Sequence, residues 1–455
     1  NLTHHVWFYF FHLDNPLLID LFKIAFTILS LHLITTFFRL YLTAQNSLMV
    51  SLVFIFFPSH DSIPYWYTAT CYLLSMAIYL YSYYLAYTNR PVAAFILALL
   101  ASFMDYGSTP IAVALFILFV LDKQIKKGMI LIVPNIIFAI YFVSVSILVA
   151  AAPSRVLEKL TLSRWLKQFS LQLATFIDAT LGPSMWFKIY YSFFHLSLTS
   201  WLIGMMLLVA LFVKYRQEID TYNTHLLISL GVLMLCSFAM FAATGRYPQL
   251  AFNLGNRTTF WGSLFLSYVI VLLPGQKLFK VTILGILLLS ALGISDHWKS
   301  WSAHQQSVIQ NIRENQDLRS MAFATKIYVS GNQYSKFGPF SHIEFLSQAW
   351  VPQAIFNLTL PRHLILETIN KRKSYRDGNL YDAEYQISTI VTEYIYIYDS
   401  DRDQLLKVNS DQINGFIDAL PEERRHWIML GEQGFVRWIR GWVVYLMPRL
   451  KETLK

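Results

Sequence analysis

Apolar residues dominate the first 295 positions, in ten runs separated by short polar connections. A membrane-spanning helix needs about 20 apolar residues. The run at 189–213 is the clearest predicted span, because no charge lies between Lys188 and Lys214. The other nine runs are 22–42, 46–57, 65–87, 92–104, 108–121, 128–150, 225–243, 259–274 and 279–295. Four of them are short and are predicted to be buried or re-entrant in part: 46–57, 92–104, 108–121 and 259–274.

From residue 296 onward the pattern changes to that of a soluble, mixed α/β domain. Residues 299–324 and 342–357 have helical spacing, and Lys326–Ser330 is typical of a strand. Alternation over 387–408, interrupted by a polar turn, predicts a hairpin. The predicted fold class is therefore mainly α: a polytopic helical membrane domain over residues 1–295, followed by a smaller α/β domain over residues 296–455.

Composition supports this division. The 455 residues are 55% hydrophobic and only 14% charged, whereas soluble domains carry roughly 25% charged residues. Residues 1–295 hold 17 basic and 9 acidic side chains, a net charge of +8, and the remainder hold 19 and 18, a net charge of +1. The basic excess thus lies in the membrane part. We expect lipid phosphates or an anionic substrate as its partners, and no nucleic acid.

The connections between runs predict an orientation. Five short ones would share one face and carry or flank nine Lys and Arg residues, which is the positive-inside pattern. The opposite face would carry the longer loops and the C-terminal domain. We therefore expect a bacterial inner-membrane protein with residues 296–455 on the periplasmic side.

Two amphipathic stretches would lie at the membrane surface. Residues 154–180 combine Arg164 and Lys167 with apolar residues at helical spacing, which predicts a helix in the headgroup layer. That helix either anchors the fold or covers a lipid-linked substrate site. Residues 434–451 are too short to span and would dock on the domain or lie on the membrane.

Asp105 is the first candidate for chemistry. It is the only charge between Arg90 and Asp122, and a carboxylate at the centre of a bilayer costs about 2.5–3.5 kcal/mol on insertion scales. Gly107 and Pro110 would supply a turn that brings it to the membrane surface. It is then either a loop aspartate that caps the following helix or a catalytic acid presented at the outer face.

Four other residues on the predicted outer face are candidates for the same site. His60 and Asp61 are adjacent in the loop 58–66, and together with Asp105 they are the catalytic candidates. Arg246 and Arg257 both lie in the loop 244–258, where guanidinium groups either contact lipid phosphate or hold the phosphate of a substrate. We predict that these acids and arginines share one outward site.

The order of these features resembles a known family. Pro58-Ser-His-Asp61 with Trp66, the Ser102-Phe-Met-Asp105 element before a proline-bearing run, and Gly255-Asn-Arg257 before a late span occur in sequence. This order is similar to that of the polytopic glycosyltransferases of the C superfamily (GT-C), especially the bacterial and TMTC-like members. The resemblance covers residues 1–295. It implies that Asp105 matches the acid of a family element and that a sugar is taken from a polyprenyl-phosphate donor on the outer face.

The resemblance also implies a catalytic acid in the first outer loop. The first acid of this chain, Asp14, lies close to the next apolar run. We therefore expect that the family's acid lies upstream of Asn1 or has been lost.

Three functional hypotheses follow. In a membrane glycosyltransferase, a carboxylate would deprotonate the acceptor while arginines or a divalent metal, Mg²⁺ or Mn²⁺, stabilise the leaving phosphate. In an inactive accessory subunit, the same fold would bind a membrane protein complex. A transporter is ranked last, because the predicted spans contain almost no charge apart from Lys23. The sequence does not specify the sugar, the acceptor, the metal or the oligomeric state.

Overall fold

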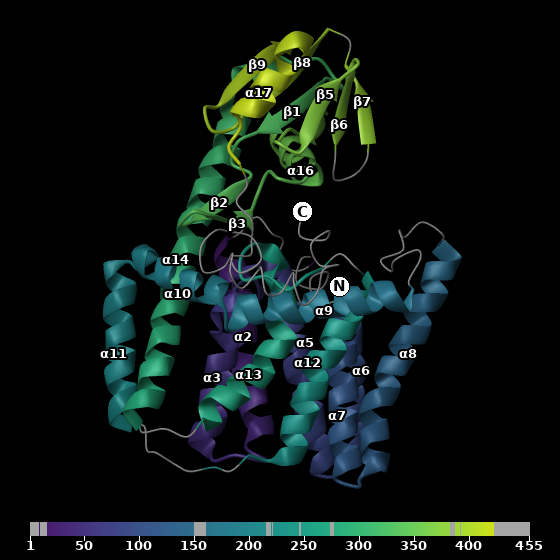
Figure 1. Ribbon diagram of the computed structural model, residues 1–455, viewed down its shortest axis with the longest axis vertical. Helices are drawn as coiled ribbons and strands as arrows, with labels where there is room; N and C mark the ends of the chain where they lie inside the picture. The colour runs from purple at the N-terminus through teal and green to yellow at the C-terminus, as the bar shows by residue number, and fades with distance from the viewer. Residues whose placement is uncertain are drawn as a thin grey trace. The chain divides into compact units, whose positions relative to one another are not determined.

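The computed structural model in Figure 1 describes Tyr9 and residues 16–149, 161–214, 220, 222–244, 247–273, 277–382, 387–391 and 393–422. Two compact units are present, one over Asn1–Asp296 and one over His297–His426.

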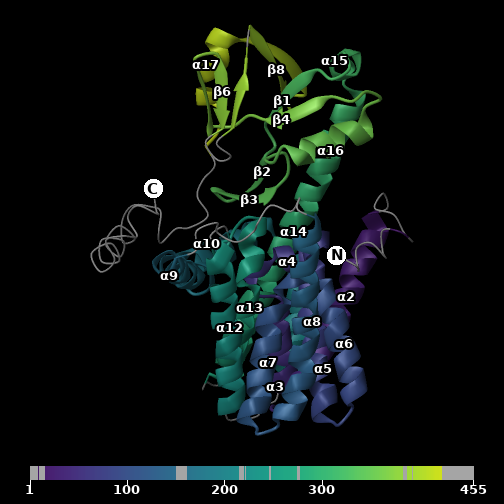
Figure 2. The ribbon, with the colours of Figure 1, turned by 90° about the vertical axis from the view of Figure 1, so that its right-hand side faces the viewer.

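The described part of the first unit is helical throughout. Figures 1 and 2 show most of its helices running side by side as a bundle. The helices are α2 (Pro16–Phe38), α3 (Ala44–Ile55), α4 (Ser62–Tyr65), α5 (Thr70–Tyr87), α6 (Pro91–Met104), α7 (Thr109–Leu121), α8 (Ile125–Val149), α9 (Leu162–Thr180), α10 (Pro183–His195), α11 (Leu198–Lys214), α12 (Thr224–Thr244), α13 (Phe260–Leu272) and α14 (Lys277–Glu314). Short 3₁₀ turns cover 58–60, 67–69, 106–108 and 254–259.

Fewer helices than expected can cross a membrane. By length and composition four described helices qualify, namely α2, α8, α12 and α14. A fifth is added if the bent α9–α10 and α11 pair counts as one span. Helices α3, α6 and α7 are apolar but short, as predicted. The structure thus shows membrane-compatible helices, and ten crossings are not shown.

The prediction of one continuous span over 189–213 is wrong. The chain breaks after His195, and α11 is bent by 115° from the preceding helices. The Asp296 carboxylate accepts a hydrogen bond from the Ser197 backbone N–H at 2.8 Å and from the Ser200 hydroxyl at 3.0 Å. The Ser197 hydroxyl also accepts from the Ser200 N–H, so the start of α11 is capped. Ser197 and Ser200 form the start of α11 together with Asp296. The absence of charged residues within 189–213 therefore did not reveal the break.

The amphipathic helix is confirmed over the described residues of 154–180, as α9. Thr161 caps it by accepting a hydrogen bond from the Arg164 N–H. Its inner face buries polar and small residues such as Gln172 and Thr175, while leucines such as Leu166 are exposed. Figure 1 shows α9 lying across the bundle helices. Residues 154–160 and 434–451 lie outside the described residues, and placement in the headgroup layer stays a prediction.

The second unit is built around a four-stranded sheet of order β4-β1-β8-β9. Strand β1 pairs in parallel with β4 and β8, and β8 pairs antiparallel with β9. A two-stranded sheet β2-β3 and a three-stranded sheet β5-β6-β7 accompany it. The strands are β1 (Lys326–Ser330), β2 (Tyr334–Phe337), β3 (Phe340–Glu344), β4 (Ile365–Thr368), β5 (Lys373–Arg376), β6 (Asn379–Asp382), β7 (Ile387–Ile390), β8 (Tyr394–Asp399) and β9 (Gln404–Asn409). The short helices are α15 (Gln316–Ser320), α16 (Trp350–Thr359) and α17 (Ile413–Ala419).

The strand at 326–330 and the hairpin with its polar turn are confirmed. Two predictions were partly wrong. The helix predicted over 342–357 covers 350–359, because 340–344 pairs as β3. Residues 387–390 belong to β7 in another sheet, and only 394–409 form the hairpin.

Candidate functional site

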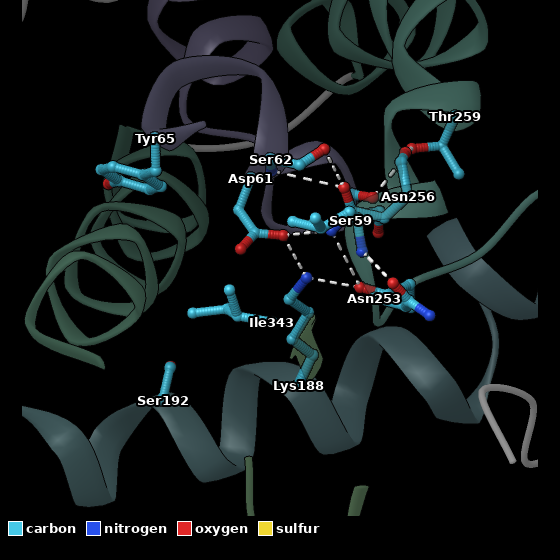
Figure 3. Close-up of polar contacts among 12 residues, drawn as sticks. Ser59, Asp61, Ser62, Tyr65, Lys188, Ser192, Asn253, Asn256, Thr259 and Ile343 are labelled. Carbon is cyan, nitrogen blue, oxygen red and sulfur yellow. Dashed lines mark hydrogen bonds and ion pairs between the residues drawn. The ribbon is translucent and has the colours of Figure 1, made fainter. Parts of the chain in front are cut away.

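Asp61 lies at the centre of a closed polar cluster in the first unit (Figure 3). Its Oδ1 accepts a hydrogen bond from the Lys188 ammonium at 2.5 Å and another from the Asn256 side-chain amide. The side chains of Asp61 and Lys188 are 3% and 0% exposed. A buried charge is tolerated only when it is paired and hydrogen-bonded, and both conditions hold here.

Lys188 reaches the cluster from α10, whose inner face is polar. Ser184, Lys188 and Ser192 follow one another at a spacing of four residues and are fully buried. The outer face of the same helix exposes aromatic side chains such as Trp186 and Tyr190. The Lys188 ammonium also donates to the Ala251 carbonyl. This helix therefore delivers one cation to the interior.

Asn256 connects the third segment to the cluster. Its side-chain oxygen accepts from the backbone N–H of Ser62 at 3.3 Å and from the Ser62 hydroxyl. The Thr259 hydroxyl donates to the Ser59 carbonyl at 2.9 Å. Three segments far apart in sequence, 59–62, α10 and 251–259, are thus held together by one set of hydrogen bonds around Asp61.

His60 is enclosed by aromatic rings. Its ring centroid lies 5.4 Å from those of Phe54 and Phe260 and 6.0 Å from that of Phe57. Burial lowers the pKa of His60 to about 3. The imidazole is therefore neutral at neutral pH. It is packed in the core, where a substrate would have to displace aromatic side chains to reach it.

Asp105 occupies the turn between α6 and α7, outside the candidate spans. The Gly107 backbone N–H donates to its carboxylate, and the Gly107 carbonyl accepts from the Trp261 indole N–H at 3.0 Å. A Cβ added at Gly107 would lie 2.5 Å from Trp261 Cζ2 and 2.7 Å from Asp105 Oδ2. Only glycine allows this close approach, which fixes the carboxylate in the turn.

The carboxyl group of Asp105 is buried without a hydrogen-bonded cation. It is 7% exposed, and in the described part of the chain no Lys or Arg lies within ion-pair distance of it. Burial raises the pKa of Asp105 to about 7, while the Gly107 N–H and the positive charge of Arg257 oppose part of that rise. Its pKa is therefore near neutrality, as a general base requires.

Arg257 is the cation whose positive charge lowers the pKa of Asp105. Its Nη1 donates to the Leu254 carbonyl at 2.8 Å, and its guanidinium carbon lies 5.4 Å from the centroid of the Trp66 ring. The side chain is only partly buried. The remaining N–H groups of the fork can therefore reach an anion, which suits phosphate oxygens.

The predicted residues thus fall into two groups. Asp61 and His60 belong to the closed interior, and Asp105 and Arg257 interact electrostatically. Arg246 lies outside the described residues. Sequence reasoning missed Lys188 and Asn256, although the i, i+4, i+8 stripe of Ser184, Lys188 and Ser192 was a usable signal. In the described ranges no group of three His, Cys, Asp or Glu side chains could hold a metal ion.

No protein-family model, curated protein or solved structure gives a significant match to this chain. The resemblance to the GT-C superfamily therefore depends on the sequence features alone.

Proposed function

We propose that this chain is a membrane glycosyltransferase-like protein of the GT-C type. It would move a sugar from a polyprenyl-phosphate donor to an acceptor at the outer membrane face. The observation that carries the proposal is the Asp105 turn: a buried carboxyl with a pKa near 7, held by Gly107 and influenced by Arg257. An unpaired buried acid of this kind marks a candidate reaction centre.

The two residues have distinct roles in the proposed reaction. Asp105 accepts the proton of the acceptor hydroxyl as its oxygen forms a bond to the anomeric carbon of the sugar. The bond between that carbon and the phosphate oxygen breaks, and the electron pair leaves with the polyprenyl phosphate. Arg257 stabilises the negative charge of this leaving group. The proton transfer and the charge stabilisation in these steps are assigned to these two side chains.

A transfer assay tests this function. The full chain, purified and placed in liposomes, would be offered a set of polyprenyl-phosphate sugars with its co-purified acceptor. We expect release of polyprenyl phosphate in amounts equal to the sugar transferred. Failure with every donor, together with recovery of the protein in fixed ratio with other subunits, would contradict the proposal.

An accessory subunit of a membrane complex is the second candidate. It is favoured by the closed cluster around Asp61, where one predicted catalytic acid is bound by Lys188 and Asn256. A chain that needs only structural integrity would keep such a cluster. In that case the variant Asp105→Asn leaves glycan transfer by the complex unchanged.

The proposal also includes a topology, with residues 296–455 on the outer face. Asp411 and Lys126 are both exposed within their own units. Cysteines placed at these two positions should be labelled from opposite sides of sealed membranes. Labelling of both from one side would contradict the proposed topology.

A further inference from the structure

A cavity lies at the end of helix α7 opposite to Asp105. It has a volume of about 510 Å³ and is formed where α2, α5 and α7 end and α12 begins. Asp105 precedes α7 and the cavity follows it, and a helix of that length spans about 20 Å. The cavity is therefore separate from the proposed reaction centre, and it lies beside the basic stretch that contains Lys123, Lys126 and Lys127.

A hydrogen-bonded chain of side chains forms one wall. His225 Nδ1 lies 2.7 Å from Asp122 Oδ1. The Tyr83 hydroxyl lies 3.4 Å from Asp122 Oδ2, and the Tyr41 and Tyr83 hydroxyls lie 2.5 Å apart. Both oxygens of the carboxylate are thus engaged. With the proton of a neutral imidazole on Nδ1 facing Asp122, the Nε2 atom of the half-exposed His225 is a hydrogen-bond acceptor for an O–H group of a ligand.

Free donors form the rest of the wall. The side chains of Lys123 and Gln124 line the cavity and have no hydrogen-bond partner among the described residues. Lys123 has a φ of 57°, in the left-handed region, which sets its side chain at the sharp turn between α7 and α8. Asn223 uses its oxygen to cap α12 at the Leu226 N–H, 2.9 Å away, which leaves its amide N–H₂.

The neighbouring Lys127 serves as a contrast. Its ammonium donates to the Tyr87 carbonyl at 3.0 Å and lies 5.7 Å from the centroid of the Tyr87 ring. It is therefore occupied at the edge of the cavity. Among the described residues that line the cavity there are one uncommitted ammonium, two amide donors and an imidazole, and the single carboxylate among them, Asp122, is already hydrogen-bonded.

We propose that this cavity binds a phosphate group, carried by a lipid headgroup or by a small soluble phosphate compound. Several convergent donors with one cation match the oxygens of a phosphate. Leu40, Leu121 and the Tyr87 ring add an apolar wall for the carbon group next to the phosphate. The surrounding basic connections raise the local concentration of anions.

A binding titration on the full chain in detergent tests this site. The two probes are inorganic phosphate and dihexanoyl phosphatidic acid, with dihexanoyl glycerol as the neutral counterpart. We expect saturable binding of at least one phosphate probe and none of the glycerolipid. Lys123→Gln should weaken that binding about tenfold or more, because a charged hydrogen bond is lost. His225→Gln should weaken it as well.

Lys126→Gln is the matched control, since Lys126 is exposed on the same connection but does not line the cavity. It should change the dissociation constant by less than about twofold. Binding of phosphatidic acid alone identifies a lipid headgroup as the source, and binding of inorganic phosphate identifies a soluble one. Absence of binding for both probes, or an equal loss in the Lys126 and Lys123 variants, would overturn the proposal. Thermal unfolding of each variant identifies any variant that fails to fold. If Lys123→Gln does not fold, His225→Gln tests the same site.

Discussion

Asp61 and Asp105 are two buried acids of the same unit, and their surroundings are opposite. Asp61 contacts a lysine and an amide at hydrogen-bond distance. Among the described residues, Asp105 is influenced by a backbone N–H and by the more distant charge of Arg257. Consecutive residues, Asn256 and Arg257, serve the two acids separately. One short turn thus supplies a structural partner to one carboxylate and an electrostatic partner to the other.

The difference shows that burial alone does not identify a reactive acid. A buried carboxylate with a bonded cation has its charge fixed and its lone pairs occupied, so it contributes to the fold. A buried carboxyl without such a cation has a raised pKa, about 7 for Asp105, so both its protonation states are present near neutral pH and its ionised form can accept a proton from a substrate. The following predictions test whether the two acids differ in this way.

The largest effect is expected from Asp105→Asn. The amide keeps the shape of the side chain but cannot accept a proton, so sugar transfer should fall by roughly 10²–10⁴-fold. Initial rates with a saturating polyprenyl-phosphate donor measure this. The surface variant Asp20→Asn, at an acid paired with Lys23 on α2, should stay within about twofold of wild type. Comparable rates for Asp105→Asn and wild type would show that Asp105 has a structural role and no catalytic one.

Lys188→Met should act on stability. Removing one partner of a buried ion pair leaves an unpaired charge and costs about 3–5 kcal/mol in the free energy of unfolding. Denaturation in detergent, followed by tryptophan fluorescence, measures this loss.

The double variant Asp61→Asn with Lys188→Met should recover part of the lost stability, because no charge remains buried. Arg39→Met, at an exposed position just after α2, is the control and should change stability by less than about 0.5 kcal/mol. A double variant less stable than Lys188→Met alone would show that the ion pair is not the main interaction of Asp61.

Arg257→Lys should have a smaller effect, and on substrate binding. Lysine keeps the charge but loses the planar fork and the contact with Trp66. We expect the KM for the phosphate-linked donor to rise about tenfold, in line with the loss of about 1.5 kcal/mol from a charged hydrogen bond. Arg39→Lys, an exposed arginine at the end of α2, is the matched control. Equal KM values for the two variants would indicate that Arg257 contacts only lipid.

Local sequence predicted most of the elements because apolar runs and their interruptions are local features. The turn at Asp105 followed from one charge beside Gly107 and Pro110. The break before Ser197 was missed, because it depends on Asp296, which lies 99 residues away in sequence. A helix cap formed by a residue from a distant segment cannot be predicted from the spacing of apolar residues.

The candidate site was predictable only in part, for the same reason. Asp61 and Asp105 could be recognised in the sequence as isolated charges. The residues that contact Asp61 could not be recognised in this way. Lys188 and Asn256 lie 127 and 195 residues from Asp61. Without these partners, Asp61 and Asp105 looked equivalent in sequence, and only the fold separates them.

The last prediction concerns the pH dependence of stability. Since burial raises the pKa of Asp105 from its ordinary value to about 7, the folded protein binds this proton more tightly than the unfolded chain does. Stability from this group is therefore full at low pH and is lost as the pH rises from about 4 through 7, with a slope of at most about 1.4 kcal/mol per pH unit. Melting temperatures of wild type and Asp105→Asn, measured in detergent from pH 5 to 9, test this, because the asparagine variant lacks the titration. The wild type should lose stability relative to the variant up to about pH 7 and then run parallel to it. Parallel curves over the whole range would mean that Asp105 is already ionised at pH 5, which would contradict a pKa raised by burial.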